Sequence, residues 1–114
     1  MKKFEGFKVK KAKDDAINGT SLQGYIDATF EYLLKTFGEP EYGSGDGKVQ
    51  AEWELEINGV VVTIYDYKEY ETPMEQVTRW HIGGKDEEAV EQLKNLMLKH
   101  GDPVCVRSVR VASW

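Results

Sequence analysis

Several features that would point to a particular chemistry are scarce in this sequence. It has one cysteine, two histidines and three prolines in 114 residues. Cys105 has no second cysteine to bond with, which is typical of a protein in a reducing compartment, and its apolar surroundings indicate a structural role. No apolar run approaches the roughly 20 residues of a membrane-spanning helix, and the start lacks the run of ~7–15 apolar residues of a secretory signal. We therefore expect a cytoplasmic protein.

Catalytic and ligand-binding motifs are also missing. The one glycine-rich stretch, residues 42–48, precedes a strand pattern rather than the helix that a Walker loop requires. His81 could serve as a general base beside Glu52 or Glu54, but no serine or cysteine is spaced to join it as a nucleophile. One histidine with carboxylates is a poor metal site. We predict a protein that is not an enzyme and that uses no metal or cofactor.

The net charge of −5 is unevenly spread along the chain. Six lysines lie within the first 13 residues against one acidic residue, Glu5, so the remainder is strongly acidic. An acidic body disfavours nucleic acid, whose binding depends on neutralising phosphates with Lys and Arg. It favours a basic partner surface, although solubility alone would also explain it. We expect no direct contact with nucleic acid or membrane.

Two alternating runs joined by Asn58-Gly59 form the clearest structural signal. An Asn-Gly pair supplies the two positive-φ residues of a type I′ turn, so a β-hairpin is predicted over residues 53–65. In a two-residue loop the register is fixed. The apolar partners, all on the core side, are Ile57 with Val60, Leu55 with Val62, and Trp53 with Ile64.

The other segments alternate between strand and helix patterns. A capping box of Thr20 and Gln23 predicts a helix that runs to Gly38, and a second helix is predicted between Gly84 and Gly101. Strands are predicted at 7–10, 78–82 and 104–111. The chain then forms one domain, 1–114, with a basic edge strand or arm (1–18), a core (19–101) and a C-terminal strand (102–114). The predicted fold is α+β, in the order β-α-β-β-β-α-β, with an antiparallel sheet of about four to five strands and both helices packed on one face.

The sheet face away from the core carries the candidate site. The hairpin register places three glutamates opposite Tyr65, Thr63 and Val61, and a neighbouring strand 78–82 would add Arg79 and His81. The candidate partner-binding residues are Glu52, Glu54, Glu56, Asp46, Tyr65, Arg79 and His81.

Several stretches resemble, in their order, a family of small conserved hypothetical proteins of bacteriophages. The resemblance spans about Thr20 to Leu98, and no agreed activity is attached to that family. It implies a phage accessory protein acting in the cytoplasm of the host cell. The stretches are Thr20-Ser21-Leu22-Gln23-Gly24-Tyr25, Phe37-Gly38-Glu39-Pro40, Gly45-Asp46-Gly47-Lys48-Val49, Ala51-Glu52-Trp53-Glu54-Leu55-Glu56, Thr63-Ile64-Tyr65-Asp66-Tyr67-Lys68 and Trp80-His81-Ile82-Gly83-Gly84.

Two hypotheses of function follow. In the first, the acidic face occupies a basic nucleic-acid-binding surface of a host defence protein, as an anti-CRISPR-like counter-defence inhibitor would. In the second, a small nucleotide signal is bound by an oligomer through Arg79, His81, Tyr65 and Tyr67, although the adjacent acidic row argues against an anionic ligand. A homodimer through Val61 and the two tyrosines is a further expectation.

Overall fold

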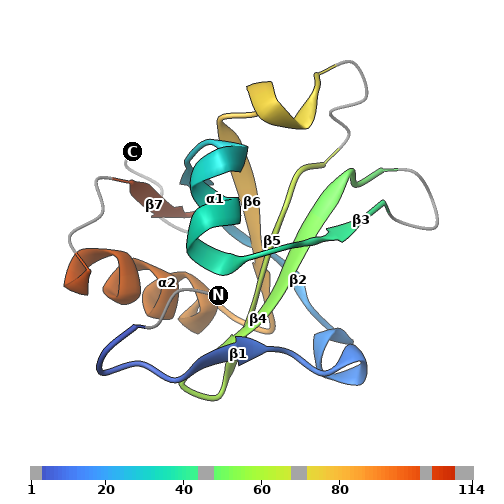
Figure 1. The fold of residues 1–114 in the computed structure, drawn as a ribbon. Helices are drawn as coiled ribbons and strands as arrows, with labels where there is room; N and C mark the ends of the chain where they lie inside the picture. The colour runs from blue at the N-terminus through green and yellow to red at the C-terminus, as the bar shows by residue number, and fades with distance from the viewer. Residues whose placement is uncertain (1–3, 44–47, 68–71, 101–103, 110–114) are drawn as a thin grey trace.

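The computed structural model describes residues 4–43, 48–67, 72–100 and 104–109. Within them the chain forms an α+β fold in which seven strands make one antiparallel sheet (Figure 1). The strands are β1 (Val9–Lys11), β2 (Ser21–Asp27), β3 (Glu41–Tyr42), β4 (Ala51–Ile57), β5 (Val60–Tyr65), β6 (Arg79–Gly84) and β7 (Cys105–Ser108). The helices are α1 (Phe30–Phe37) and α2 (Glu88–Lys99), and two 3-10 turns are η1 (Asp14–Ile17) and η2 (Met74–Gln76).

The predicted hairpin is confirmed as the centre of this sheet. Asn58 and Gly59 have φ angles of 51° and 83°, as a type I′ turn requires. All the predicted partners pair, from Ile57 with Val60 to Glu52 with Tyr65. The sheet order is β1-β4-β5-β6-β2-β7, with β3 also beside β4. The predicted neighbourhood of β4, β5 and β6, and the edge position of β1, are therefore correct.

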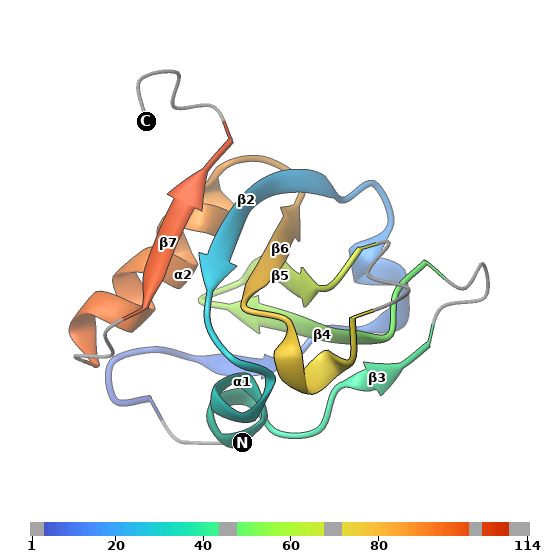
Figure 2. The ribbon, with the colours of Figure 1, turned by 90° about the horizontal axis from the view of Figure 1, so that it is seen from above.

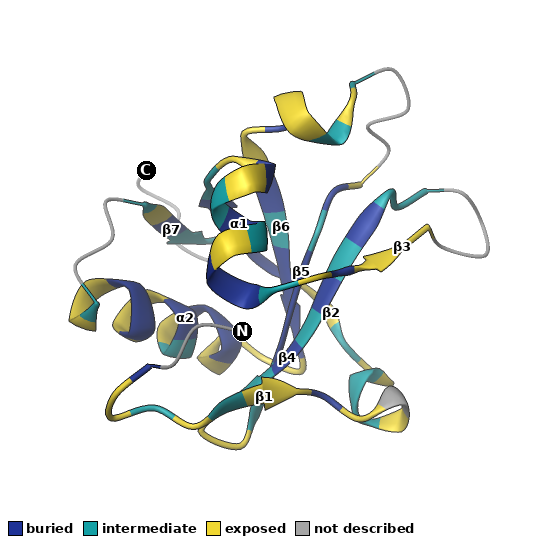
Figure 3. Cartoon of the chain, viewed as in Figure 1, coloured by how far each residue is buried: buried dark blue, intermediate teal, exposed yellow. Residues whose placement is uncertain are grey.

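The core lies between the sheet and the two helices, both on one face as predicted. Trp53 and Trp80 from β4 and β6 meet edge to face at 5.5 Å between ring centroids, and Phe30 of α1 contacts both rings. The Trp53 indole N–H donates to the carbonyl of Gly38 at 2.7 Å, which ties the end of α1 to the sheet. In Figure 3 the helices are dark, meaning buried, on the sides that face the strands. We call this the inner face and the opposite one the outer face.

The predicted helix from Thr20 is wrong over its first ten residues. Residues 21–27 form β2, which pairs with β6 on one side and β7 on the other. The Thr20 hydroxyl donates to the carbonyl of Ile17, whereas Thr29 is the residue that caps α1, accepting from the backbone N–H of Tyr32 at 3.0 Å. The apolar residues of 20–27 fit both a helical and a strand period. The strand forms because its two edges pair with β6 and β7.

Gly24 allows β2 to lie between β6 and β7. A Cβ on Gly24 would lie 2.2 Å from the backbone oxygen of Arg107, so only glycine permits this close approach. A bulge between Leu22 and Gly24 accompanies it. The sheet therefore has seven described strands rather than the four to five predicted, because β2 and the short β3 were not foreseen.

The sheet curls around the helices, so its outer face is convex (Figures 1 and 2). Part of this face is covered, because the chain crosses from β1 at one edge to β2 near the other. The crossing segment includes η1, which contacts β5, and since α2 covers the inner face of β5, η1 lies on the outer face. Thr63 is buried to 3% exposure. The outer face is thus less open than the sequence predicted.

Candidate functional site

One cross-strand row organises the outer face. Consecutive partners in this row lie on six neighbouring strands, in the order Glu41, Glu52, Tyr65, His81, Tyr25 and Arg107. The row is acidic at β3 and β4, aromatic across β5, β6 and β2, and basic at β7. The structure thus brings together Glu52, Tyr65 and His81 as the sequence predicted, and adds residues at both ends.

The acidic end contains a small cavity at the edge of β4. The cavity lies between the pairing of β1 with residues 55–57 and that of β3 with residues 51–52, next to the Glu54 carbonyl, which accepts from the Ala12 N–H at 2.9 Å. The cavity has a volume of about 100 Å³, room for a few water molecules. Its lining combines four glutamates and one lysine with an apolar floor: Glu39, Glu41, Glu52, Glu54, Lys11, Phe37, Trp53 and Leu55. We call this the glutamate cavity.

The predicted glutamate row is divided by this arrangement. Glu52 and Glu54 line the glutamate cavity, whereas Glu56 lies 3.9 Å from the ammonium group of Lys10 on β1. Lys11, the next residue, forms an ion pair with Glu41 at the rim of the cavity. The basic amino end therefore lies against the acidic strand and neutralises part of it. Asp46, the other predicted acidic residue, lies outside the described residues.

Glu52 is the most perturbed acidic group at this end. Its pKa is raised to about 7, first by burial, then by a hydrogen bond with Glu54 and by the negative charges of Glu54 and Glu41. Burial, followed by the charge of Glu52, also raises the pKa of Tyr65. A cation placed in the glutamate cavity would relieve this repulsion, and Glu52 would then release its proton near neutral pH.

The middle of the row is an aromatic cluster around His81. The His81 ring stacks on Tyr65 at 5.4 Å, lies 5.2 Å from Tyr25 and meets Tyr67 edge to face at 5.8 Å. Gly83 makes room for this packing, since a Cβ there would lie 2.3 Å from the Thr63 hydroxyl and 3.2 Å from the Tyr65 ring. Tyr65, Tyr67 and His81 were expected to meet, but Tyr25 was hidden by its assignment to a helix.

Arg79 pairs with an acidic residue of β2. It lies on the outer face as expected, but its Nε donates to Asp27 at 3.1 Å rather than pairing with a glutamate, because β2 is the second neighbour of β6. Its guanidinium also lies 5.8 Å from the centre of the Tyr25 ring. The positive end of the row is therefore separate from the glutamate cavity.

In the part of the chain that the structure describes, no three His, Cys, Asp or Glu side chains are placed to hold a metal ion. Cys105 is exposed on β7 beside Asp27. Within the same residues, no helix is long and apolar enough to cross a membrane.

Comparisons with known proteins give no relative from which a role could be transferred. No family model matches the chain, and neither the curated proteins nor the solved structures contain a significant match.

Proposed function

We propose that this chain is a non-enzymatic binding protein whose glutamate cavity accepts a lysine or arginine side chain from a basic partner surface. The glutamate cavity carries the proposal, because its glutamates suit the charged head of such a side chain. The apolar side chains beneath them, Phe37, Trp53 and Leu55, are 2–3% exposed, so the contact is made mainly with the glutamates. Lys11 supports this, since its own ammonium group is bound at the rim by Glu41.

The shape of the outer face favours a concave partner. The sheet curls so that its outer face is convex (Figure 2), and the glutamate cavity lies at the edge of β4, where a groove lined by Lys and Arg would bring several cations against Glu52, Glu54 and Glu39 at once. Grooves of this kind bind nucleic acid, so the protein would act by occupying such a groove. The resemblance to small phage proteins suggests a host defence protein as the partner, in the host cytoplasm, and hence a counter-defence role.

Self-association through Val61, Tyr65 and Tyr67 is the competing expectation. Two convex faces share less area than a convex and a concave one, and stable interfaces need about 800 Å² per partner. The curvature therefore favours a different partner over a second copy.

The experiment is a pull-down with the tagged protein from lysate of a bacterial host with intact defence systems. We expect a stoichiometric nucleic-acid-binding protein that is released by moderate salt, as expected of exposed charge pairs. The double variant Glu52→Lys/Glu54→Lys should lose it, whereas Glu88→Lys/Glu91→Lys, which changes the same charge on α2, should retain it.

Two results would count against the proposal. One is equal retention of the partner by both double variants, provided that circular dichroism shows both to be folded. The other is a partner that resists salt and binds the Glu52→Gln/Glu54→Gln variant as well as the original chain.

A further inference from the structure

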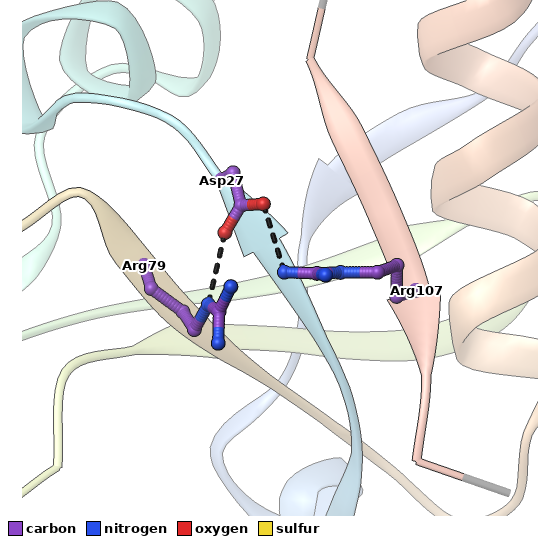
Figure 4. Close-up of polar contacts among 3 residues, drawn as sticks. All are labelled: Asp27, Arg79 and Arg107. Carbon is purple, nitrogen blue, oxygen red and sulfur yellow. Dashed lines mark hydrogen bonds and ion pairs between the residues drawn. The ribbon is translucent and has the colours of Figure 1, made fainter. Parts of the chain in front are cut away.

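The basic end of the cross-strand row contains a second constellation, formed by three charged side chains from adjacent strands. Asp27 of β2 lies between Arg79 of β6 and Arg107 of β7, as Figure 4 shows. Arg79 Nε donates to one carboxylate oxygen at 3.1 Å, and Arg107 Nη2 donates to the other at 2.9 Å. Asp27 therefore accepts hydrogen bonds from two guanidinium groups on the outer face.

Asp27 holds the two guanidinium groups in fixed orientations. Among the described residues, Arg79 makes this contact through Nε, and its two terminal amino groups can donate to a bound ligand. The Arg79 side chain is 57% exposed. An arginine fixed by a carboxylate loses less conformational entropy when it binds a phosphate through paired N–H donors. The constellation is therefore suited to an anion with several oxygens.

An aromatic surface lies directly beside these arginines. Tyr25 is the cross-strand partner of Arg107, and its ring is 5.8 Å from the Arg79 guanidinium. His81 lies 5.2 Å from Tyr25 with the ring planes at 51°, so the two rings form an aromatic cluster beside the Arg79 guanidinium. An aromatic ring beside an arginine is a common arrangement for nucleotide binding, because the base stacks on the ring and the phosphate accepts hydrogen bonds from the guanidinium.

The distance to the glutamates limits what can bind here. At the usual strand spacing, Arg107 on β7 is four strands and about 19 Å from Glu52, whereas Arg79 on β6 is two strands and about 10 Å from β4. Both distances exceed the screening length of about 8 Å at physiological salt, so the glutamates repel a single phosphate at the arginines only weakly. A longer nucleic acid strand laid along the row would reach Glu52 and Glu54 and be repelled.

We infer that Arg79, Arg107, Tyr25 and His81 form a binding site for a nucleoside monophosphate, with the phosphate at the arginines and the base on the rings. Asp27 is a positioning residue in this site. The site uses none of the residues of the glutamate cavity, so it stands or falls independently of the proposed partner binding.

The test is calorimetric titration of the purified protein at low ionic strength with the four common nucleoside 5′-monophosphates. We expect saturable binding of at least one of them, weaker by about tenfold or more in Arg79→Gln, because a charge-assisted hydrogen bond is lost. Lys35→Gln, which removes one exposed positive charge from α1, is the matched control and should bind normally. Tyr25→Leu should also weaken binding, through loss of stacking.

Other ligands separate the contribution of the arginines from that of the aromatic rings. Inorganic phosphate and the unphosphorylated nucleosides should each bind more weakly than the monophosphate, and a short single-stranded oligonucleotide should bind no more tightly. Absence of binding by every monophosphate would overturn the inference. So would unchanged affinity in folded Arg79→Gln, equal affinity for inorganic phosphate, or tighter binding of the oligonucleotide.

Discussion

Glu52 shows how a single residue acquires its properties from its neighbours. It is half-buried on β4, with Glu54 two residues along the same face and Glu41 across the edge on β3. Burial and these two carboxylates favour its protonated form. The cost of its charge at neutral pH is consistent with a surface that gains from a cationic partner.

This raised pKa predicts a pH-dependent stability. The pKa of Glu52 rises from 4.5 to about 7 on folding, so the folded state binds the proton more tightly and stability falls as the pH rises through this range. Glu52→Gln removes the effect. After allowance for screening by solvent, we expect the variant to be about 1 kcal/mol more stable than the original chain at pH 8 and nearly equal at pH 5.

Thermal melts at both pH values measure this difference, with Glu88→Gln on the exposed face of α2 as the control. A Glu52→Gln gain that is the same at pH 5 and pH 8 would show that the pKa is not raised.

Asp66 is a buried carboxylate with a structural task. It is fully buried at the end of β5, and Oδ1 accepts from the backbone N–H groups of Gln50 and Ala51 at 2.8 and 3.1 Å. Oδ2 accepts from the Gln50 side chain at 2.9 Å. It thereby fixes the start of β4, the strand that carries the glutamate cavity.

Asp66→Ala should lower the free energy of unfolding by about 2–3 kcal/mol, because buried donors lose their acceptor. Asp66→Asn retains one carbonyl oxygen for the backbone and should lose less. Urea denaturation of both variants provides the measurement, and an Asp66→Ala variant as stable as the original chain would refute this role.

At the scale of elements, the stability of α1 depends on the residue that caps its N-terminus. Thr29 caps α1, and the acidic Glu31 lies in its first turn. Thr29→Ala should therefore cost about 1 kcal/mol of stability, the usual value for a lost N-cap, whereas Thr20→Ala should cost clearly less. Denaturant melts of the two variants compare them directly. The reverse order would support a helix that begins at Thr20.

The hairpin, its faces and the pairing of β5 with β6 were predictable, but β2 as the second neighbour of β6 was not. Asn58-Gly59 determines a turn locally, and alternation then determines which side chains face the core. The place of β2 depends on pairing with residues more than 50 positions away, such as Tyr25 with His81, which no local pattern contains. For this reason Tyr25, Asp27 and Arg107 were missed, and so was the ion pair of Arg79 with Asp27.

Glu39 and Glu41 were missed for a different reason. They flank Pro40 directly after α1, where the sequence indicates only the end of a helix. Their acidity was visible as Glu-Pro-Glu, but their approach to Glu52 depends on the short pairing of β3 with β4.

At the scale of the whole molecule, the outer face is a surface with two ends. Glutamates lie at β3 and β4, arginines at β6 and β7, and the rings around His81 separate them. The curl of the sheet makes this surface convex (Figure 1). A partner can therefore bind one end without contacting the other.

A hexa-arginine peptide is the simplest probe of whether the glutamate cavity binds a cationic side chain. Calorimetric titration at low salt and pH 8, where Glu52 is ionised, should show binding to the original chain. Glu52→Gln/Glu54→Gln should weaken it by about tenfold, as expected for two partly screened charges, and Glu88→Gln/Glu91→Gln should leave it nearly unchanged. Equal weakening by both pairs, or no weakening by either, would contradict the proposal, because binding would then follow net charge rather than the glutamate cavity.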